Sequence, residues 1–202
     1  MPRWVSGAGP LLGGRHSIGG EPLTLRLLRR GDERVWLNLR ARERERLQPW
    51  EATPPGGPAP SVSFGQYVRA ERRAVAAREA LPLVVEWERA LVGRVTVHRI
   101  EWGAECGASL GYWVAREWTG RGIAPRAVAL AADHAFRQGI HRLEIAVRPE
   151  NTASLRVVDK LGFRDEGLRR GYLFIDGAWR DHRVFALTAG EERTGEFWPA
   201  HP

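Results

Sequence analysis

The sequence is short of the residues that mark several classes of protein. Its 202 residues include a single cysteine, Cys106, so no disulfide can form within the chain, and nothing indicates an oxidising compartment. No stretch of 18 or more apolar residues occurs, which excludes a membrane-spanning helix. Residues 1–20 also lack the continuous apolar segment of a signal peptide. We therefore expect a cytoplasmic protein that contacts no membrane.

Lysine is almost absent, since Lys160 is the only one, and arginine supplies nearly all of the positive charge. The formal net charge is +7. A basic surface suits a phosphorylated ligand, a ribosome or a tRNA, but arginines scattered over a solvated surface give the same total, so charge alone selects no function. Hydrophobic residues make up 43% of the chain and charged residues 27%, a balance typical of a soluble globular domain.

Hydrophobic periodicity predicts an α/β domain with the element order β-α-α-β-β-β-α-β-α-β-β, a mixed sheet with helices on its faces. We expect strands at residues 23–27, 81–87, 91–100, 108–114, 142–147, 163–175 and 179–187, and helices that start at Asp32 and span 63–80, 125–137 and 152–161. Residues 53–60 (TPPGGPAP) must be a loop because prolines cannot continue a helix. Asp176-Gly177 is a typical hairpin turn. The domain is expected at residues 21–188, between a flexible N-terminal tail (1–20) and a C-terminal tail (189–202).

Residues 119–124 are the most informative segment of the chain. A predicted strand ends before them, Gly120 and Gly122 permit a tight turn, and a helix is expected to start at Pro125, because proline is favoured at the first helical position. Several backbone N–H groups of such a turn point at one spot, where the helix dipole adds positive potential. An anion can therefore bind there without a charged side chain. A side chain at Gly122 is expected to keep a phosphate away from the backbone.

Three kinds of phosphate-binding turn connect a strand to a helix in this way. A nucleotide P-loop requires Gly-Lys-Ser/Thr, which the chain lacks. A Rossmann turn requires glycine or alanine where Pro125 stands. The type that remains binds the diphosphate of an acyl-CoA, and an ordinary glycine-rich connection without a ligand is the alternative.

A second helix start follows at residues 148–154. Asn151 is a good N-cap, and Ser154, three residues later, has a small polar side chain that can join the capping. Between Gly122 and Asn151 there is room for one helix and one strand, so both helix N-termini are expected at the same edge of the sheet. Ligands of open α/β sheets bind at such an edge, where neighbouring strands diverge.

At these residues the sequence resembles the GNAT family of N-acetyltransferases. Residues 119–124 resemble the family's Q/R-x-x-G-x-G/A signature, and residues 149–154 together with 160–163 (KLGF) resemble its second motif. The segments LQPWE (47–51), GYW (111–113) and GAWRDH (177–182) resemble the RimJ/RimL branch, the ribosomal-protein N-terminal acetyltransferases. The resemblance covers about residues 21–188. Thr119 departs from the Gln or Arg of the signature, and Pro125 removes one amide from the helix start.

The resemblance implies a GNAT fold with a central splayed sheet and acetyl-CoA as cofactor. The acceptor it implies is a primary amine, either a protein N-terminus, with ribosomal association, or a small amine such as an aminoglycoside. The residues expected to bind the cofactor are Trp113, Val114, Thr119, Gly120, Arg121, Gly122, Ile123, Ala124, Asn151 and Ser154. In the resembled branch, the position of Ser154 serves the departing thiolate and that of Asn151 orients the pantetheine arm. No metal site is expected.

Acetyl transfer to an α-amine requires a base, because such an amine is mostly protonated at pH 7 and must lose a proton before it attacks. The candidates are Glu51, in the loop after the first helix, and Glu144, on the strand before the second helix start, with a chain of waters as the alternative. The three histidines considered are more often structural at such positions; they are His98, His134 and His182.

The mouth of the substrate site is expected at Trp50, Glu51 and Tyr112. Amides at the end of the strand 111–114 are expected to polarise the thioester carbonyl. A non-catalytic acyl-CoA-binding or RNA-binding protein is the alternative if no carboxylate faces the cleft.

Overall fold

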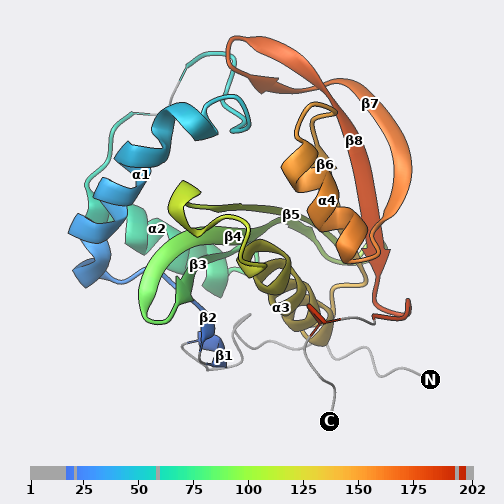
Figure 1. The fold of residues 1–202 in the computed structure, drawn as a ribbon, viewed down its shortest axis with the longest axis horizontal. Helices are drawn as coiled ribbons and strands as arrows, with labels where there is room; N and C mark the ends of the chain where they lie inside the picture. The colour runs from blue at the N-terminus through green and yellow to red at the C-terminus, as the bar shows by residue number, and fades with distance from the viewer. Residues whose placement is uncertain (1–16, 21, 58–59, 194–195, 199–202) are drawn as a thin grey trace.

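The computed structural model describes residues 17–20, 22–57, 60–193 and 196–198, which form one mixed sheet of eight strands with helices on both faces (Figure 1). The spatial order of the strands is β1-β2-β3-β4-β5-β6-β8-β7. Their bounds are β1 (Ser17–Gly20), β2 (Leu23–Arg26), β3 (Leu81–Trp87), β4 (Ala90–Glu101), β5 (Gly107–Val114), β6 (Arg142–Val147), β7 (Arg164–Ile175) and β8 (Ala178–Thr188). The helices are α1 (Glu33–Leu47), α2 (Phe64–Ala76), α3 (Ile123–Arg137) and α4 (Thr152–Lys160), with 3-10 turns η1 (Arg30–Asp32) and η2 (Arg116–Trp118).

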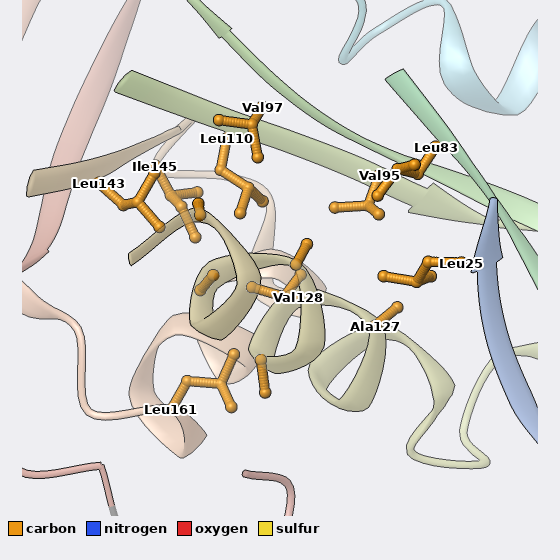
Figure 2. Packing of buried hydrophobic residues seen from close by; sticks show 14 of the residues in the cluster. Leu25, Leu83, Val95, Val97, Leu110, Ala127, Val128, Leu143, Ile145 and Leu161 are labelled. Atoms are coloured by element: carbon orange, nitrogen blue, oxygen red, sulfur yellow. The ribbon is translucent and has the colours of Figure 1, made fainter. Parts of the chain in front are cut away.

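The larger core lies between the sheet and α3. Figure 2 shows Ala127 and Val128 of α3 facing side chains of the strands, among them Val95 and Leu110. Several positions on the buried side of α3 are alanines that are at most 1% exposed, so the helix axis can approach the sheet closely. The residues Leu25, Leu83, Val97, Leu143, Ile145 and Leu161 complete the part of the core that Figure 2 labels.

A smaller core on the opposite face of the sheet holds α1 and α2. Trp36 of α1 and Phe64 of α2 pack there with Val84 of β3, and Trp113 of β5 packs against them. Side chains alternate between the two faces along a strand, so Val84 faces α2 while its neighbours Leu83 and Val85 belong to the larger core. α1 and α2 thus cover one face, and α3 and α4 cover the other.

The parallel strands β5 and β6 are paired only where they begin. Residues 107–109 pair with residues 142–144, whereas β5 continues to Val114 and β6 to Val147 without further pairing between them. The two strands therefore separate toward their carboxyl ends. α3 follows β5 and α4 follows β6, so the N-termini of both helices lie at this opening, which confirms the expectation from the sequence.

The predicted element order is confirmed except for one additional strand, β1, at its start, and most bounds agree within one or two residues. Two helices differ. The helix predicted for residues 63–80 ends at Ala76, and Arg78, at a φ of 60°, has left the helical region. α3 begins at Ile123 rather than at Pro125, because Gly122 already acts as its N-cap. None of the helices within the described ranges is long and apolar enough to cross a membrane.

The expected domain limits, residues 21 and 188, are too narrow at both ends. Residues 17–20 form β1, which pairs in antiparallel fashion with β2 instead of belonging to a tail. After β8, Trp198 is only 8% exposed and belongs to the larger core, with Phe197 packed against it. The rest of the two expected tails, at 1–16, 194–195 and 199–202, lies outside the described residues.

Candidate functional site

The turn between β5 and α3 presents a row of backbone amides at the opening. Gly120 and Gly122 have φ values of 78° and 73°, in the left-handed region that favours glycine. Among the described residues, no protein acceptor is bonded to the N–H groups of residues 120–124. Gly120 and Arg121 are exposed to solvent. Unpaired amides at a helix N-terminus suit an anion such as a phosphate.

The space beside Gly122 is bounded by the ring of Phe197. A Cβ built on Gly122 lies 3.2 Å from Cε1 of Phe197, whereas a Cβ built on Gly120 meets nothing within 4 Å. A side chain at Gly122 would therefore meet the ring of Phe197, and the expectation that it would keep a phosphate away from the backbone stays a prediction. Gly122 is required by its backbone conformation and by this close ring.

Two further positions of the turn correct the sequence-based interpretation. The amide and the hydroxyl of Thr119 both donate to the carbonyl of Arg116, at 3.2 and 2.8 Å. They close the turn η2, so Thr119 contributes neither donor to the opening. Pro125 is the third residue of α3, not the first. Its missing N–H costs no helical hydrogen bond, because the first four amides of a helix have no partner within it.

The end of β5 contributes a second set of amides. The N–H of Ala115 donates to the carbonyl of Val92 at 2.7 Å. Hydrogen-bonded and non-bonded pairs alternate along an antiparallel ladder, so the amides of Tyr112 and Val114 turn away from β4 and toward the opening beside β6. The role expected of these amides, to polarise the thioester carbonyl, stays a prediction. The carbonyl of Val114 accepts a hydrogen bond from Arg46 of α1 at 2.6 Å.

Tyr112 and Trp113 lie on opposite faces of the sheet. The Tyr112 hydroxyl lies 3.4 Å from the carbonyl oxygen of Ser154, on the face that α4 covers. Trp113 packs on the α1 side, with its ring centroid 5.9 Å from that of Trp36. The sequence placed Tyr112 at the acceptor mouth and Trp113 at the cofactor. The structure places the two side chains on opposite faces because side chains alternate along a strand, and the roles predicted for them stay predictions.

The N-terminus of α4 is capped by Asn151. Its side-chain oxygen accepts the amide of Ser154 at 3.1 Å. Within the described part of the chain, the Ser154 hydroxyl has no hydrogen-bond partner, so it takes no part in the capping. Ser154 is half-buried and its hydroxyl remains available to a ligand in the opening.

On the α1 face, Arg40 and Glu51 form a bidentate ion pair with N–O distances of 2.5 and 2.8 Å. The pair stands between two pockets of about 540 and 740 Å³, and both residues line each of them. Hydrogen bonding to Glu51 raises the pKa of Arg40, against the opposing effect of burial. The larger pocket has an aromatic wall made of Trp36, Phe64, Tyr67 and Trp113. A carboxylate beside an aromatic cavity can bind an amine together with an apolar group.

The loop that carries Trp50 and Glu51 is fixed to the β7–β8 hairpin and to the end of β6. Thr53 donates its amide to the carbonyl of Phe174 at 2.9 Å. Arg148, just after β6, donates to the carbonyl of Pro49 at 2.7 Å and lies over the ring of Trp50 at 5.3 Å. These contacts bring the predicted mouth residues Trp50 and Glu51 toward the β6 side of the opening.

Glu144 forms ion pairs with two arginines. Arg142 donates to it at 2.7 Å, and Arg169 of β7 lies 3.1 Å from its second oxygen. Neither described pocket includes Glu144. Both candidate carboxylates therefore have cationic partners, but of the two only Glu51 lines either of these two pockets.

The three histidines considered from the sequence are buried or half-buried in the protein. Burial, followed by the nearby charge of Arg99, lowers the pKa of His98. Burial is also the main cause that lowers the pKa of His182, whose Nδ1 lies 3.0 Å from the carbonyl oxygen of Arg180. His134 is buried on α3. Across the described residues, no group of three or more His, Cys, Asp or Glu residues is arranged to hold a metal ion.

Several residues that shape the site were not predicted from the sequence. Glu43 of α1 bonds to Arg46 and accepts the amide of Arg116, so it fixes the segment after β5 to α1. Arg40, Glu43 and Arg46 follow each other at intervals of three along α1. This interval places them on one helix face, and it was the sequence signal from which their proximity could have been predicted. Phe197, beside the amide turn, had no comparable signal.

Comparison with protein families gives one domain match. The sequence model of the Acetyltransferase (GNAT) domain matches residues 22–164. Among solved structures, Mycobacterium smegmatis RimJ in complex with CoA-disulfide superimposes with a TM-score of 0.80 at 35% identity, over 90% of each chain. The ribosomal-protein-S5-alanine acetyltransferase of Vibrio fischeri gives a TM-score of 0.75 at 28% identity, over 87% of this chain and 97% of that one.

Two curated relatives match over shorter lengths. The [Ribosomal protein uS5]-alanine N-acetyltransferase of Escherichia coli is 34% identical over 109 residues, which are 54% of this chain and 56% of the relative. The probable N-acetyltransferase YjcK of Bacillus subtilis is 41% identical over 98 residues, or 48% of this chain and 54% of the relative. The matched part thus spans about half the length of these relatives.

Proposed function

This chain belongs to the GNAT acetyltransferase family, and we propose that it transfers an acetyl group from acetyl-CoA to the α-amine at the N-terminus of a protein. The observation that carries the proposal is the turn of residues 120–124. Its amides are free of acceptors among the described residues, and two glycines in the left-handed region hold them at the start of α3. This turn fits the diphosphate of coenzyme A, because it offers several N–H donors and the positive end of a helix dipole.

The opening between β5 and β6 fits the remainder of the cofactor. The amides of Tyr112 and Val114 face it from one side, and the start of α4 with the Ser154 hydroxyl faces it from the other. Acetyl-CoA supplies an activated acetyl group, as a thioester whose C–S bond breaks when the amine nitrogen attacks the carbonyl carbon. The amides of β5 are suited to stabilise negative charge on the carbonyl oxygen, and Ser154 donates a hydrogen bond or a proton toward the sulfur.

The acceptor enters from the α1 face, where the two pockets meet at Glu51. Glu51 receives the proton of the ammonium group, directly or through a water molecule, so that the nitrogen lone pair becomes available. Arg40 holds the Glu51 carboxylate in place by two hydrogen bonds. Trp113 separates this side from the cofactor side as a part of the pocket wall.

Two observations support a protein acceptor. The relatives that match over most of both chains include an enzyme named for its action on ribosomal protein S5, and we extend this substrate class, and association with the ribosome, to the present chain as part of the proposal. The pockets also carry as many arginines as carboxylates: Arg40, Arg44 and Arg94 against Glu33, Glu51 and Asp176. A polycationic small molecule such as an aminoglycoside would be held by a clear excess of carboxylates.

The test is a thiol-release assay with purified protein and acetyl-CoA. The acceptors are peptides that carry the N-terminal sequences of ribosomal proteins, the same peptides with a blocked α-amine, and a panel of polyamines and aminoglycosides. We expect release with free N-termini and none with blocked ones. Acetylation of the small amines alone would reject the protein acceptor, and failure of acetyl-CoA to bind in calorimetry would reject acetyl transfer itself.

A further inference from the structure

Phe197 of the C-terminal segment lies directly beside the amide turn. Its ring carbon Cε1 is 3.2 Å from the position that a Cβ on Gly122 would take. Trp198 anchors this segment, since it is 8% exposed within the larger core and Arg193 lies over its ring at 5.9 Å. The ring of Phe197 is therefore placed by the core at the start of α3, far in sequence from the residues that it touches.

Two cations lie over the same ring. The guanidinium carbon of Arg126, in the first turn of α3, is 5.6 Å from the centroid of Phe197, and the ammonium nitrogen of Lys160, in the last turn of α4, is 5.3 Å from it. The two charges are thus less than about 11 Å apart, the sum of these distances. Aromatic rings attract such cations at these distances.

These two cations differ from several of the arginines on the strands. Arg26, Arg94, Arg142 and Arg164, for example, all form ion pairs with carboxylates. Over the ranges that the structure describes, Arg126 and Lys160 make no ion pair with a carboxylate. A carboxylate would have neutralised them, whereas an aromatic ring holds a cation in place and leaves its charge to act on a ligand.

We propose that Phe197 is a positioning residue of the cofactor site, which holds Arg126 and Lys160 beside the amide turn so that they bind the phosphates of coenzyme A. This inference rests on the proposed function, because it takes the turn of residues 120–124 as the diphosphate site. It assigns the C-terminal segment to cofactor binding, and it predicts that affinity for CoA depends on a ring at position 197.

The experiment measures the dissociation constant of CoA by calorimetry at low salt for the full chain and for Phe197→Ala. We expect binding about tenfold weaker in the variant, since each cation loses a contact worth a few-fold in affinity. Phe197→Tyr keeps the ring and should bind like the parent chain. Trp102→Ala is the matched control, because Trp102 also lies under an arginine, Arg78, but at the turn between β4 and β5.

A double-mutant cycle separates this role from simple packing. If Phe197 acts through the cations, the combined variant Phe197→Ala/Arg126→Ala should lose less affinity than the sum of the two single losses, and the same should hold with Lys160→Ala. Dephospho-CoA, which lacks the 3′-phosphate, shows which phosphates the cations bind. If the variants weaken the binding of dephospho-CoA less than that of CoA, the cations bind the 3′-phosphate. If they weaken both equally, the cations bind the diphosphate.

Three results would overturn the proposal. The first is an unchanged dissociation constant in Phe197→Ala, and the second is a lower one, which would mean that the ring obstructs the site. The third is fully additive losses of affinity in the double-mutant cycle. Thermal melting of each variant shows whether it is folded, and a lowered melting temperature with unchanged affinity also counts against the proposal. Failure of the parent chain to bind CoA would instead reject the proposed function.

Discussion

The hydroxyl of Tyr112 on β5 lies 3.4 Å from the carbonyl oxygen of Ser154 in α4, so it connects the two sides of the opening between β5 and β6. Burial raises the pKa of Tyr112 to about 12, and the contact with Ser154 lowers it by less. The phenol therefore stays protonated at every pH used for an acetyl-transfer assay, and it donates to Ser154.

Replacement of Tyr112 by phenylalanine should lower turnover severalfold and leave acetyl-CoA affinity nearly unchanged. The ring would still pack, but the donor that holds the start of α4 relative to β5 would be lost. At 3.4 Å this hydrogen bond is long, so the free energy of unfolding should fall by less than about 1 kcal/mol. Steady-state kinetics and urea unfolding check the two parts. A variant that loses cofactor affinity while it keeps its turnover would show that Tyr112 serves binding instead.

Ser154→Ala isolates the serine hydroxyl from the cap of α4. The cap uses the Asn151 side chain and the backbone amide of Ser154, and alanine keeps that amide. We expect turnover to fall at least about tenfold, with the stability of the fold within about 0.5 kcal/mol of the parent chain. Asn151→Ala is the contrasting variant, since it removes the cap and should cost about 1 kcal/mol of stability. Unchanged turnover in Ser154→Ala would exclude a role for the hydroxyl at the sulfur.

Most of the fold was predictable because its signals are local. The alternation in β2 and the apolar spacing of α3 each lie within one element, and Asp176-Gly177 marks its hairpin by itself. The amide turn was also predictable, since Gly120 and Gly122 indicate two positions where the backbone can be left-handed, as it is in the structure.

The contacts between elements were not predictable in the same way. Trp198 belongs to the larger core although the residues before it carry no regular apolar pattern, and β1 pairs through Ile18 and its neighbours in a glycine-rich segment. The faces of Tyr112 and Trp113 depend on which face of β5 each helix covers, and single-strand alternation does not say which. The partner of Glu51 was hidden because Arg40 lies 11 residues away, across a helix end.

Gly122→Val should weaken acetyl-CoA binding by more than about tenfold. Valine at a φ of 73° strains the backbone by roughly 1–2 kcal/mol, and its Cβ also meets Phe197. Both effects displace the amides of the turn. Gly139→Ala is a control, because Gly139 has a φ of 94° at the far end of α3 and a Cβ there makes only an ordinary contact at 4.0 Å. Calorimetry with acetyl-CoA measures the result, and equal affinity in Gly122→Val would reject the phosphate turn.

Asp32→Asn should destabilise the fold at pH 7, and this effect should become smaller as the pH falls. Asp32 forms an ion pair at 2.7 Å with Arg26, which is 4% exposed. Burial alone would raise the pKa of Asp32, but hydrogen bonds from Arg26 and from the amide of Arg29 lower it on balance. A carboxyl whose pKa is lowered by folding stabilises the protein above its unfolded pKa, and this contribution disappears as the pH falls through the folded pKa.

The expected loss at pH 7 is about 3 kcal/mol, because the variant leaves a buried guanidinium with Glu86 as its remaining carboxylate. Urea unfolding at pH 7 and pH 2 measures the difference between variant and parent chain at each pH. Glu117→Gln is the control: its pair with Arg42 is exposed, so it should change stability by less than about 0.5 kcal/mol. A loss that is the same at both pH values would contradict the assigned role of the Asp32 charge.

Glu51→Gln and Glu144→Gln distinguish the two candidate bases. Glu51 lines both pockets on the acceptor side, whereas the oxygens of Glu144 are bonded to Arg142 and Arg169. If Glu51 receives the amine proton, Glu51→Gln should lower kcat about a hundredfold and leave the affinity for acetyl-CoA unchanged. Glu144→Gln should keep kcat within about threefold.

The pH dependence of kcat gives the second readout for this pair. A base must be deprotonated to act, so the parent chain should lose activity as the pH falls through the pKa of that base, and this acid limb should disappear in Glu51→Gln. A nucleophilic amine also needs deprotonation, so the comparison is made with one peptide at one concentration, which keeps the acceptor's own titration the same in both enzymes. An acid limb that persists in Glu51→Gln and disappears in Glu144→Gln would transfer the role to Glu144. Persistence in both variants would leave proton removal to water, since neither carboxylate would then control the step.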